Sequence, residues 1–355
     1  MNSYLYTVMR NVGLQYIRTS IVVLTIVWTY SLYAQHDISK FKLENISDPV
    51  LPLITNRVID TIQHDWMVLK NEIDHRNSLK VFIVEAGDDS VYCKKSGNYS
   101  LVDMFIQPGN DWVLLIHGDS KAPVDAAVRV LEVQNLHHVK VLVFSWPSKK
   151  DTQNGLNNFK NSQMNVVDGL AHFRELLLFL QKYKQSFIWP EGNKLSLFMH
   201  SLGNYYLELA VNEDMLGGLD SNLFDNIIIN AAAVEQENHA DWVEKLRISK
   251  RIYIISNSKD FNLRGARMFT RAHKMLGGPV EPPLAANAYY INFTEAVGFK
   301  LPTWVSHTYF VGEMPQKSSN IKNFYTTIFH GEEVNLHDEN MFRPGSDGPV
   351  FDILK

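Results

Sequence analysis

The chain has 355 residues, of which 45% are hydrophobic and 20% are charged, and its formal net charge is −4. Such a chain can bury a substantial core, and its length allows one large α/β domain or two small ones. The negative charge and the absence of any long Lys/Arg block in the sequence argue against a nucleic-acid backbone as the main partner.

The first 34 residues have the form of a targeting signal. Arg10 and Arg18 precede an apolar run from Ile21 to Trp28, and Ala34 is a small residue suited to cleavage. The run is short for a membrane span, so we predict a cleaved signal peptide over residues 1–34. The mature protein is then exported, periplasmic or extracellular, without a stable membrane anchor. A retained N-terminal anchor is the alternative.

The chain has a single cysteine, Cys93. An exported protein with one thiol has no intrachain disulfide, so its stability must come from its core. No Gly-rich turn or nearby His supports Cys93 as a nucleophile, and we interpret it as a small apolar residue in a strand.

Residues 35–78 are mixed in character and are predicted to form an N-terminal extension packed on the main domain. Within them, Thr61 to Ile73 has helical spacing. Leu79 to Ala86 is predicted to be a strand, and after a turn Ser90 to Cys93 is predicted to be a second one. We expect these two strands to form the antiparallel opening hairpin of the main sheet.

From Asp111 onward, short apolar strands alternate with amphipathic helices, which is typical of a mostly parallel sheet with helices on both faces. The predicted strands span residues 112–116, 139–146, 195–199, 227–232, 251–256 and 289–293. The predicted helices span residues 123–131, 165–183, 204–212, 263–275 and 318–329. Two long loops, 147–164 and 277–288, are placed to shape a pocket. We assign the main domain to residues 79–330 and a polar C-terminal tail to residues 331–355.

One stretch of this region carries a candidate nucleophile. The strand that ends at Met199 is followed by His200-Ser201-Leu202-Gly203, and apolar residues beyond it recur with helical spacing. A sharp turn from a strand into a helix at such a serine builds a nucleophile elbow, which lifts the hydroxyl above the carboxyl edge of the sheet. The pattern resembles the small-x-Ser-x-Gly elbow of α/β-hydrolases, except that Met199 is bulky where the turn prefers a small residue.

A serine nucleophile needs a base, and the base needs a carboxylate that orients it. In α/β-hydrolases the order along the chain is Ser, acid, His. Asp260 follows the predicted strand 251–256, and His307 follows the last predicted strand. We therefore expect Ser201, His307 and Asp260 to form a catalytic triad, although Asp260 could instead be a cap or turn residue and Glu235 is a rival acid. The histidines that compete with His307 are His239, His273 and His330.

The oxyanion of a tetrahedral intermediate needs two backbone N–H donors. Leu202 follows the nucleophile and is expected to supply the first. His117-Gly118-Asp119 follows an early strand and resembles the His-Gly-x loop of the family, which makes the N–H of Asp119 the second candidate. Negative charge beside a developing oxyanion opposes catalysis. The Asp119 side chain is therefore expected to point away and cap the next turn, or to select a cationic group of the substrate.

Three segments carry a more specific resemblance, which covers about residues 111–310. They are Phe144-Ser145-Trp146-Pro147-Ser148, His200-Ser201-Leu202-Gly203-Asn204 and Ser306-His307-Thr308-Tyr309-Phe310. In kind and order they are similar to an uncharacterised bacterial branch of esterase/lipase-like α/β-hydrolases. The resemblance implies hydrolysis of a carboxylic ester or related acyl bond through an acyl-enzyme, and no particular substrate. It places Trp146 at one wall beside the nucleophile, with His117, Gly118 and His200 in the pocket.

No cofactor or metal is expected. The adjacent histidines 137–138 cannot share one helix face, and neither Gly217-Gly218 nor Gly277-Gly278 extends to a phosphate-binding fingerprint. The expected partner is a small-molecule acyl ester. Two alternatives stay open: a non-catalytic binding or envelope protein that kept the fold, and a peptidase or thioesterase that uses the same triad.

Overall fold

The computed structural model describes most of the chain beyond residue 48. The described residues are 49–63, 66–76, 78–86, 91–149, 155–270, 274–345 and 349–355. The signal peptide expected over residues 1–34 lies outside them, as do His273 and the turn expected after Ala86. Within the described ranges, no helix combines the length and the apolar character needed to cross a bilayer.

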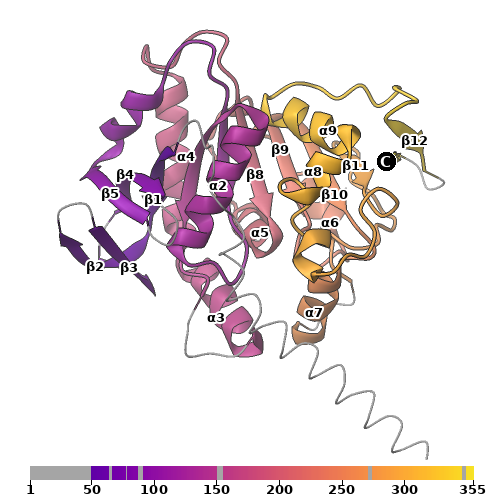
Figure 1. Cartoon of the computed structure of the whole chain (residues 1–355), viewed down its shortest axis with the longest axis horizontal. Coiled ribbons are helices and arrows are strands. Elements are labelled where there is room, and N and C mark those ends of the chain that lie inside the picture. Colours follow the sequence, from indigo (N-terminus) through magenta and orange to yellow (C-terminus); the bar gives the residue numbers. More distant parts are fainter. Residues whose placement is uncertain are drawn as a thin grey trace, which may run out of the picture. The chain divides into compact units, whose positions relative to one another are not determined.

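One sheet organises the described part of the chain (Figure 1). Its strands are β1 Val50–Thr55, β2 Arg57–Gln63, β3 Trp66–Ile73, β4 Lys80–Ala86, β5 Val91–Gly97, β6 Trp112–Ile116, β7 Lys140–Ser145, β8 Leu195–His200, β9 Phe224–Asn230, β10 Ser249–Ser256, β11 Tyr289–Asn292, β12 Phe342–Pro344 and β13 Val350–Ile353. Their order across the sheet is β2-β3-β5-β4-β1-β7-β6-β8-β9-β10-β11-β13-β12. Neighbours from β1 to β13 in this order are parallel, whereas β2, β3, β4, β5 and β12 pair antiparallel.

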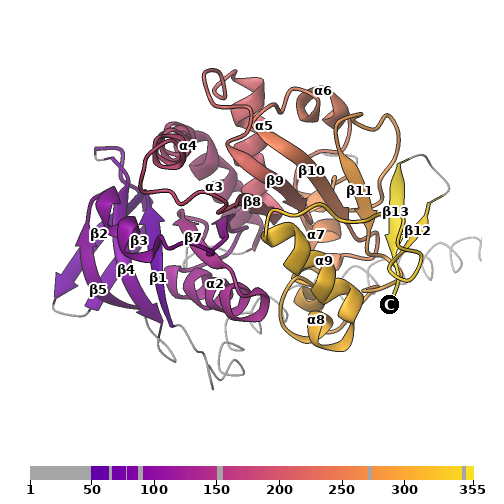
Figure 2. The ribbon, with the colours of Figure 1, turned by 90° about the horizontal axis from the view of Figure 1, so that it is seen from above.

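Helices cover both faces of the parallel part of the sheet. They are α2 Pro123–His137, α3 Gly155–Asp168, α4 Leu170–Lys184, α5 Asn204–Asn212, α6 His239–Val243, α7 Phe261–Phe269, α8 Glu313–Lys317 and α9 Ser319–Phe329. Figure 2 shows α2, α8 and α9 on one face and α4, α5 and α6 on the other. Every residue of β6, β8 and β9 is buried, as expected for strands covered on both sides. The predicted class, a mixed α/β protein with a large and mostly parallel sheet, is confirmed.

Strands β2 and β3 stand where a helix was predicted. We expected a helix over residues 61–73, but the structure pairs the two strands antiparallel, with Ile59 opposite Leu69 and Thr61 opposite Val68. The helix prediction was wrong because a short apolar run with β-branched residues fits the spacing of a strand as well as that of a helix. Pairing with a neighbouring strand decides between the two.

Both ends of the predicted domain contribute further strands. The expected hairpin of β4 and β5 forms. However, β1 from the predicted extension lies between β4 and β7, and it is parallel to β7. At the other edge, β13 from the predicted tail pairs in parallel with β11. The sheet therefore includes residues on both sides of the expected domain limits at 79 and 330.

The helix predicted over residues 165–183 is two helices, α3 and α4, which meet at Gly169. A Cβ at Gly169 would lie 2.6 Å from the hydroxyl of Tyr206 in α5, so the close approach of α5 leaves room only for glycine. Because α3 begins at Gly155, the loop predicted over residues 147–164 is shorter than expected. Its asparagines favour loops by propensity, but the packing of α3 against α4 and α5 overrides that preference.

Candidate active site

The candidate nucleophile lies where β8 meets α5. Strand β8 ends at His200, and a 3₁₀ turn over Ser201–Gly203 leads into α5. Ser201 has a φ of 53°, a left-handed conformation that a β-carbon disfavours. Asn204 holds the turn by donating from Nδ2 to the carbonyl oxygens of Met199 (3.1 Å) and Ser201 (2.9 Å). Ser201 thus occupies a sharp strand-to-helix turn at the carboxyl end of a central strand.

The turn packs closely against the end of β6. A Cβ at Gly203 would lie 2.8 Å from the carbonyl oxygens of both Ile116 and His117, so this position requires glycine. Met199, the bulky residue that departs from the elbow pattern, is fully buried. The core accommodates its side chain, and the turn still forms.

Asp260 and His307 are in direct contact. Nδ1 of His307 lies 2.6 Å from Oδ2 of Asp260, and both side chains are buried. The other carboxylate oxygen, Oδ1, accepts hydrogen bonds from the backbone N–H groups of Asn262 (2.9 Å) and Leu263 (3.2 Å) at the start of α7. Asp260 therefore caps a helix and orients a histidine at the same time, so the two interpretations of this residue are compatible.

Asn257 ties the loop after β10 to the loop that carries His307. Its Nδ2 donates to the carbonyl oxygens of Ser306 and Gly298, both at 3.0 Å. The backbone carbonyl oxygen of Asn257 accepts from the N–H of Asp260 at 3.0 Å. This buried amide fixes the relative position of the two loops, and with it the Asp260–His307 contact. The sequence pattern did not indicate its role.

His307 reaches the elbow beside His200. The ring centroids of the two histidines are 4.7 Å apart, and His200 directly precedes Ser201. Ser201 and His307 are each 8% exposed. Within the described residues no hydrogen bond joins Ser201 Oγ to His307, and such bonds often tighten only when substrate is bound. The three predicted triad residues lie at the carboxyl edge of the sheet, with Asp260 and His307 bonded to each other.

The loop after β6 lies beside the candidate nucleophile. A Cβ at Gly118 would come 2.7 Å from Cβ of Ser201 and 3.2 Å from its Oγ, so the backbone of Gly118 faces that side chain. Leu202 lies in the first turn after the strand, where helical N–H groups have no partner within the helix. Among the described residues, the N–H of Asp119 donates to no backbone or side-chain acceptor. Both predicted oxyanion donors are therefore on segments that adjoin Ser201.

The Asp119 side chain is engaged by its neighbours. Oδ1 accepts from Asn158 Nδ2 of α3 at 2.9 Å, and Oδ2 accepts from Ser120 Oγ at 3.0 Å. Burial raises the pKa of Asp119 to about 6, against the hydrogen bonds from Ser162 and Ser120, which lower it. The carboxylate is thus directed at α3 and its own turn, as expected for the alternative in which it points away from the oxyanion.

His117 and Trp146 join the loops that follow β6 and β7. The backbone N–H of Trp146 donates to Nε2 of His117 (3.2 Å), and Trp146 Nε1 donates to the His117 carbonyl oxygen (2.8 Å). His117 Nδ1 then carries the proton and donates to the carbonyl oxygen of Gly118 at 2.9 Å. Burial lowers the pKa of His117 to about 3. Trp146 is fully buried and stacks on His117. These two side chains therefore hold the loops after β6 and β7 together.

Arg57 has a supporting role that the sequence pattern did not indicate. The side chain is 1% exposed. It donates to Ser145 Oγ (3.2 Å) and to the Lys121 carbonyl oxygen (3.0 Å), and it also contacts the Trp146 carbonyl oxygen. Burial lowers the pKa of Arg57 to about 9. The available signal was a charged residue two positions after the end of the apolar strand Val50–Thr55.

The rival residues have other partners. His239 is bonded to the carbonyl oxygen of Gln236 (2.7 Å) and to the hydroxyl of Tyr290 (2.8 Å). His330 is paired with Asp111 at 2.8 Å, but Asp111 precedes β6 and so lies at the opposite, amino edge of the sheet. Glu235 forms an isolated bridge with Met275, and the acid in contact with His307 is Asp260.

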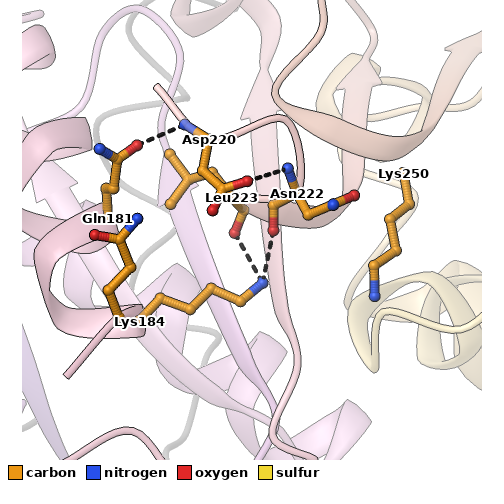
Figure 3. A pocket seen from close by; sticks show the side chains of 7 residues that line it. Gln181, Lys184, Asp220, Asn222, Leu223 and Lys250 are labelled. Atoms are coloured by element: carbon orange, nitrogen blue, oxygen red, sulfur yellow. Dashed lines mark hydrogen bonds between the residues drawn. The ribbon is translucent and has the colours of Figure 1, made fainter. Parts of the chain in front are cut away.

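A hollow of about 360 Å³ lies at the amino edge of the sheet (Figure 3). It is lined by residues from the end of α4, the loop before β9 and the start of β10, namely Gln181, Lys184, Gln185, Asp220, Asn222, Leu223 and Lys250. Lys184 Nζ donates to the carbonyl oxygens of Asn222 and Leu223, both at 3.0 Å, and lies 3.5 Å from Asp225. Its ammonium group is thus engaged in holding this loop. None of the predicted site residues lines the hollow.

The described residues contain no group of three or more His, Cys, Asp or Glu side chains placed to hold a metal ion. Comparison of the chain with protein-family models, with curated proteins and with solved structures gave no match. Its function must therefore be inferred from its own residues and their geometry.

Proposed function

We propose that this chain is a serine hydrolase that cleaves carboxylic esters or related acyl bonds. One observation carries the proposal: the buried Asp260–His307 pair, at 2.6 Å, lies beside the turn that presents Ser201. An orienting carboxylate, an imidazole base and a hydroxyl are the three groups that nucleophilic acyl transfer requires. They come in the order Ser, acid, His along the chain, as in α/β-hydrolases.

In the proposed mechanism, His307 takes the proton of Ser201 as Oγ attacks the carbonyl carbon of the substrate. Asp260 keeps Nδ1 of His307 protonated, so that Nε2 is the base, and it stabilises the imidazolium that forms. The N–H groups of Leu202 and Asp119 stabilise the oxyanion. His307 then protonates the leaving group, and water, activated by the same imidazole, releases the acyl group from Ser201.

We also propose that the chain has the α/β-hydrolase fold. The support is the run of parallel strands covered on both faces, together with an elbow at the carboxyl end of the central strand β8. The resemblance of three segments to the esterase/lipase-like branch agrees with this proposal. For localisation we propose export, because the apolar run Ile21 to Trp28 with its preceding arginines fits a cleaved signal peptide.

The decisive experiment is labelling with a fluorophosphonate probe, which reacts with activated serines. The purified wild-type protein should be labelled, and the variant Ser201→Ala should not. Ser221→Ala, at an exposed serine away from the elbow, is the matched control and should be labelled like the wild type. Undiminished labelling of Ser201→Ala would remove Ser201 from the scheme.

The second candidate is a non-catalytic binding or envelope protein that kept this fold. One observation favours it: Ser201 and His307 are nearly enclosed. A panel of p-nitrophenyl esters with short and long acyl chains separates the two candidates. Turnover that is lost in His307→Ala supports the hydrolase, whereas no turnover at any acyl length supports the binding protein.

A further inference from the structure

A second imidazole lies against His307 and takes no part in the steps described above. His200 is 6% exposed. Its ring centroid is 4.7 Å from that of His307 and 5.1 Å from that of Phe310. A residue in this position touches the proposed base throughout the reaction, so its charge and its orientation bear on proton transfer.

Two buried side chains determine which nitrogen of His200 carries a proton. The Tyr325 hydroxyl lies 2.6 Å from Oδ1 of Asn230, and Nδ2 of Asn230 lies 3.2 Å from Nδ1 of His200. A separation of 2.6 Å is typical of O–H···O and short for N–H···O, so the amide oxygen faces Tyr325 and the NH₂ group faces His200. Nδ1 of His200 then accepts a hydrogen bond, and the proton is on Nε2.

Burial keeps both the Tyr325 hydroxyl and the His200 ring uncharged. Burial raises the pKa of Tyr325 well above its usual range, so its hydroxyl stays a donor. Burial also lowers the pKa of His200 well below its usual range. The charged or titratable groups that act on His200 are His307, Arg129, Lys121 and His117. All of them oppose a proton on His200, because each is cationic when charged.

A neutral neighbour matters because His307 becomes positively charged when it takes a proton from Ser201. A second positive charge on a ring 4.7 Å away would oppose that step, since like charges at this distance repel strongly in a buried site. A fixed and uncharged ring restricts the orientation of His307 without this penalty.

We propose that His200 is a positioning residue: an imidazole held neutral by Asn230 and Tyr325, which fixes the ring of His307 and leaves it free to accept a proton. The inference rests on the proposed hydrolase function. It concerns the base of the triad and adds no new chemical step.

The variant Asn230→Asp tests the proposal, because a carboxylate beside Nδ1 favours a charged His200. We expect the pH profile of kcat/KM to gain a second ionisation on its acid side. At pH 6 the rate should fall by about tenfold or more, with KM little changed. The matched control, Asn222→Asp, introduces the same charge at an exposed position on the amino edge of the sheet, so it should keep a single ionisation. An Asn230→Asp variant with the wild-type profile would overturn the proposal.

The variant His200→Phe separates positioning from proton transfer. It keeps a neutral ring of similar size, so its activity should stay within about tenfold of the wild type. A loss of about a thousandfold in a variant that circular dichroism shows to be folded would mean that His200 itself transfers a proton, which contradicts the proposal.

Nitrogen NMR of the full chain provides a readout that does not depend on turnover. The signals of His200, assigned by their loss in His200→Phe, should report a neutral ring with its proton on Nε2 from pH 5 to pH 8. Titration of His200 near the ordinary histidine pKa of about 6.5 would refute the inference. A neutral His200 in a chain that is neither labelled nor active would instead refute the hydrolase function, and the positioning role with it.

Discussion

At the residue scale, Asp260 links the stability of an element to the chemistry of the site. One carboxylate oxygen caps α7 and the other is bonded to His307. The two tasks can be separated by substitution, because asparagine caps a helix about as well as aspartate does. Asparagine has no negative charge with which to stabilise an imidazolium, and its amide favours the wrong tautomer of the histidine.

We therefore expect Asp260→Asn to lose about 10⁴-fold in kcat while its free energy of unfolding changes little. Asp260→Ala should lose similar activity and, in addition, about 1 kcal/mol of stability, because the cap is gone. Urea unfolding and ester hydrolysis, measured on both variants, check the two parts separately. If Asp260→Asn kept a tenth or more of the wild-type activity, Asp260 would not be the orienting acid.

The candidate triad could be predicted from the sequence because each of its members follows a buried strand. Ser201, Asp260 and His307 were selected by that position and by their order, and the structure brings Asp260 and His307 into contact. Asn230 and Tyr325 could not be predicted in the same way. They are 95 positions apart, and their hydrogen bond depends on how α9 packs on β9, which no local pattern encodes.

At the scale of elements, the loop after β6 packs closely against the elbow because Gly118 has no side chain. Gly118 lies so close to Ser201 that a methyl group there would come 2.7 Å from Cβ of the serine. A real side chain would force either the loop or Ser201 to move. The spacing between the loop after β6 and Ser201 is thus set by a backbone-to-side-chain contact.

For Gly118→Ala we expect kcat/KM to fall by about a hundredfold or more, because a displacement of about 1 Å at a reacting group has an effect of that size. The accompanying loss of stability should be about 1 to 3 kcal/mol, as for other overpacked sites. Gly155→Ala is the matched control, since a Cβ at the start of α3 meets no atom within 4 Å. Wild-type kinetics for Gly118→Ala would show that the loop does not contact the reacting groups.

The elements that could be predicted are those with buried, continuous apolar sequences. Strands β6, β8 and β9 are buried along their whole length. The limits of β6 and β8 were predicted to within one residue, whereas β9 begins and ends before its predicted limits. The errors arose where long-range contacts overrode local propensity. Strand β2 pairs with β3 although the stretch has helical spacing. The helix predicted over residues 165–183 is divided at Gly169, where Tyr206 packs too closely to leave room for a side chain.

At the scale of the whole molecule, buried histidines make stability depend on pH. Burial lowers the pKa of His117 to about 3 and that of His137 to about 4, and it also lowers the pKa of His200. In the unfolded chain each has its ordinary pKa of about 6.5. Because the folded values are the lower ones, the unfolded state binds more protons as the pH falls. The contribution of these neutral histidines to the free energy of unfolding is complete above pH 6.5 and is lost progressively toward pH 4.

His137 offers a direct test, since its two ring nitrogens are bonded to Thr326 Oγ1 (2.8 Å) and the Phe310 carbonyl oxygen (2.9 Å). Between pH 7 and pH 4.5 the wild type should lose about 2 to 3 kcal/mol more stability than His137→Gln does, at about 1.4 kcal/mol per pKa unit. Urea unfolding at both pH values measures this difference. His75→Gln, at an exposed position, should follow the wild type. Parallel losses in His137→Gln and the wild type would contradict the prediction.

The left-handed backbone at Ser201 links the durability of the turn to the identity of a single side chain. Its φ of 53° costs on the order of 1 kcal/mol for a residue with a β-carbon, whereas glycine adopts it freely. Replacement of Ser201 by glycine would relieve this cost and remove the hydroxyl in the same step. Resistance to unfolding and the reactivity proposed for this position would then change in opposite directions.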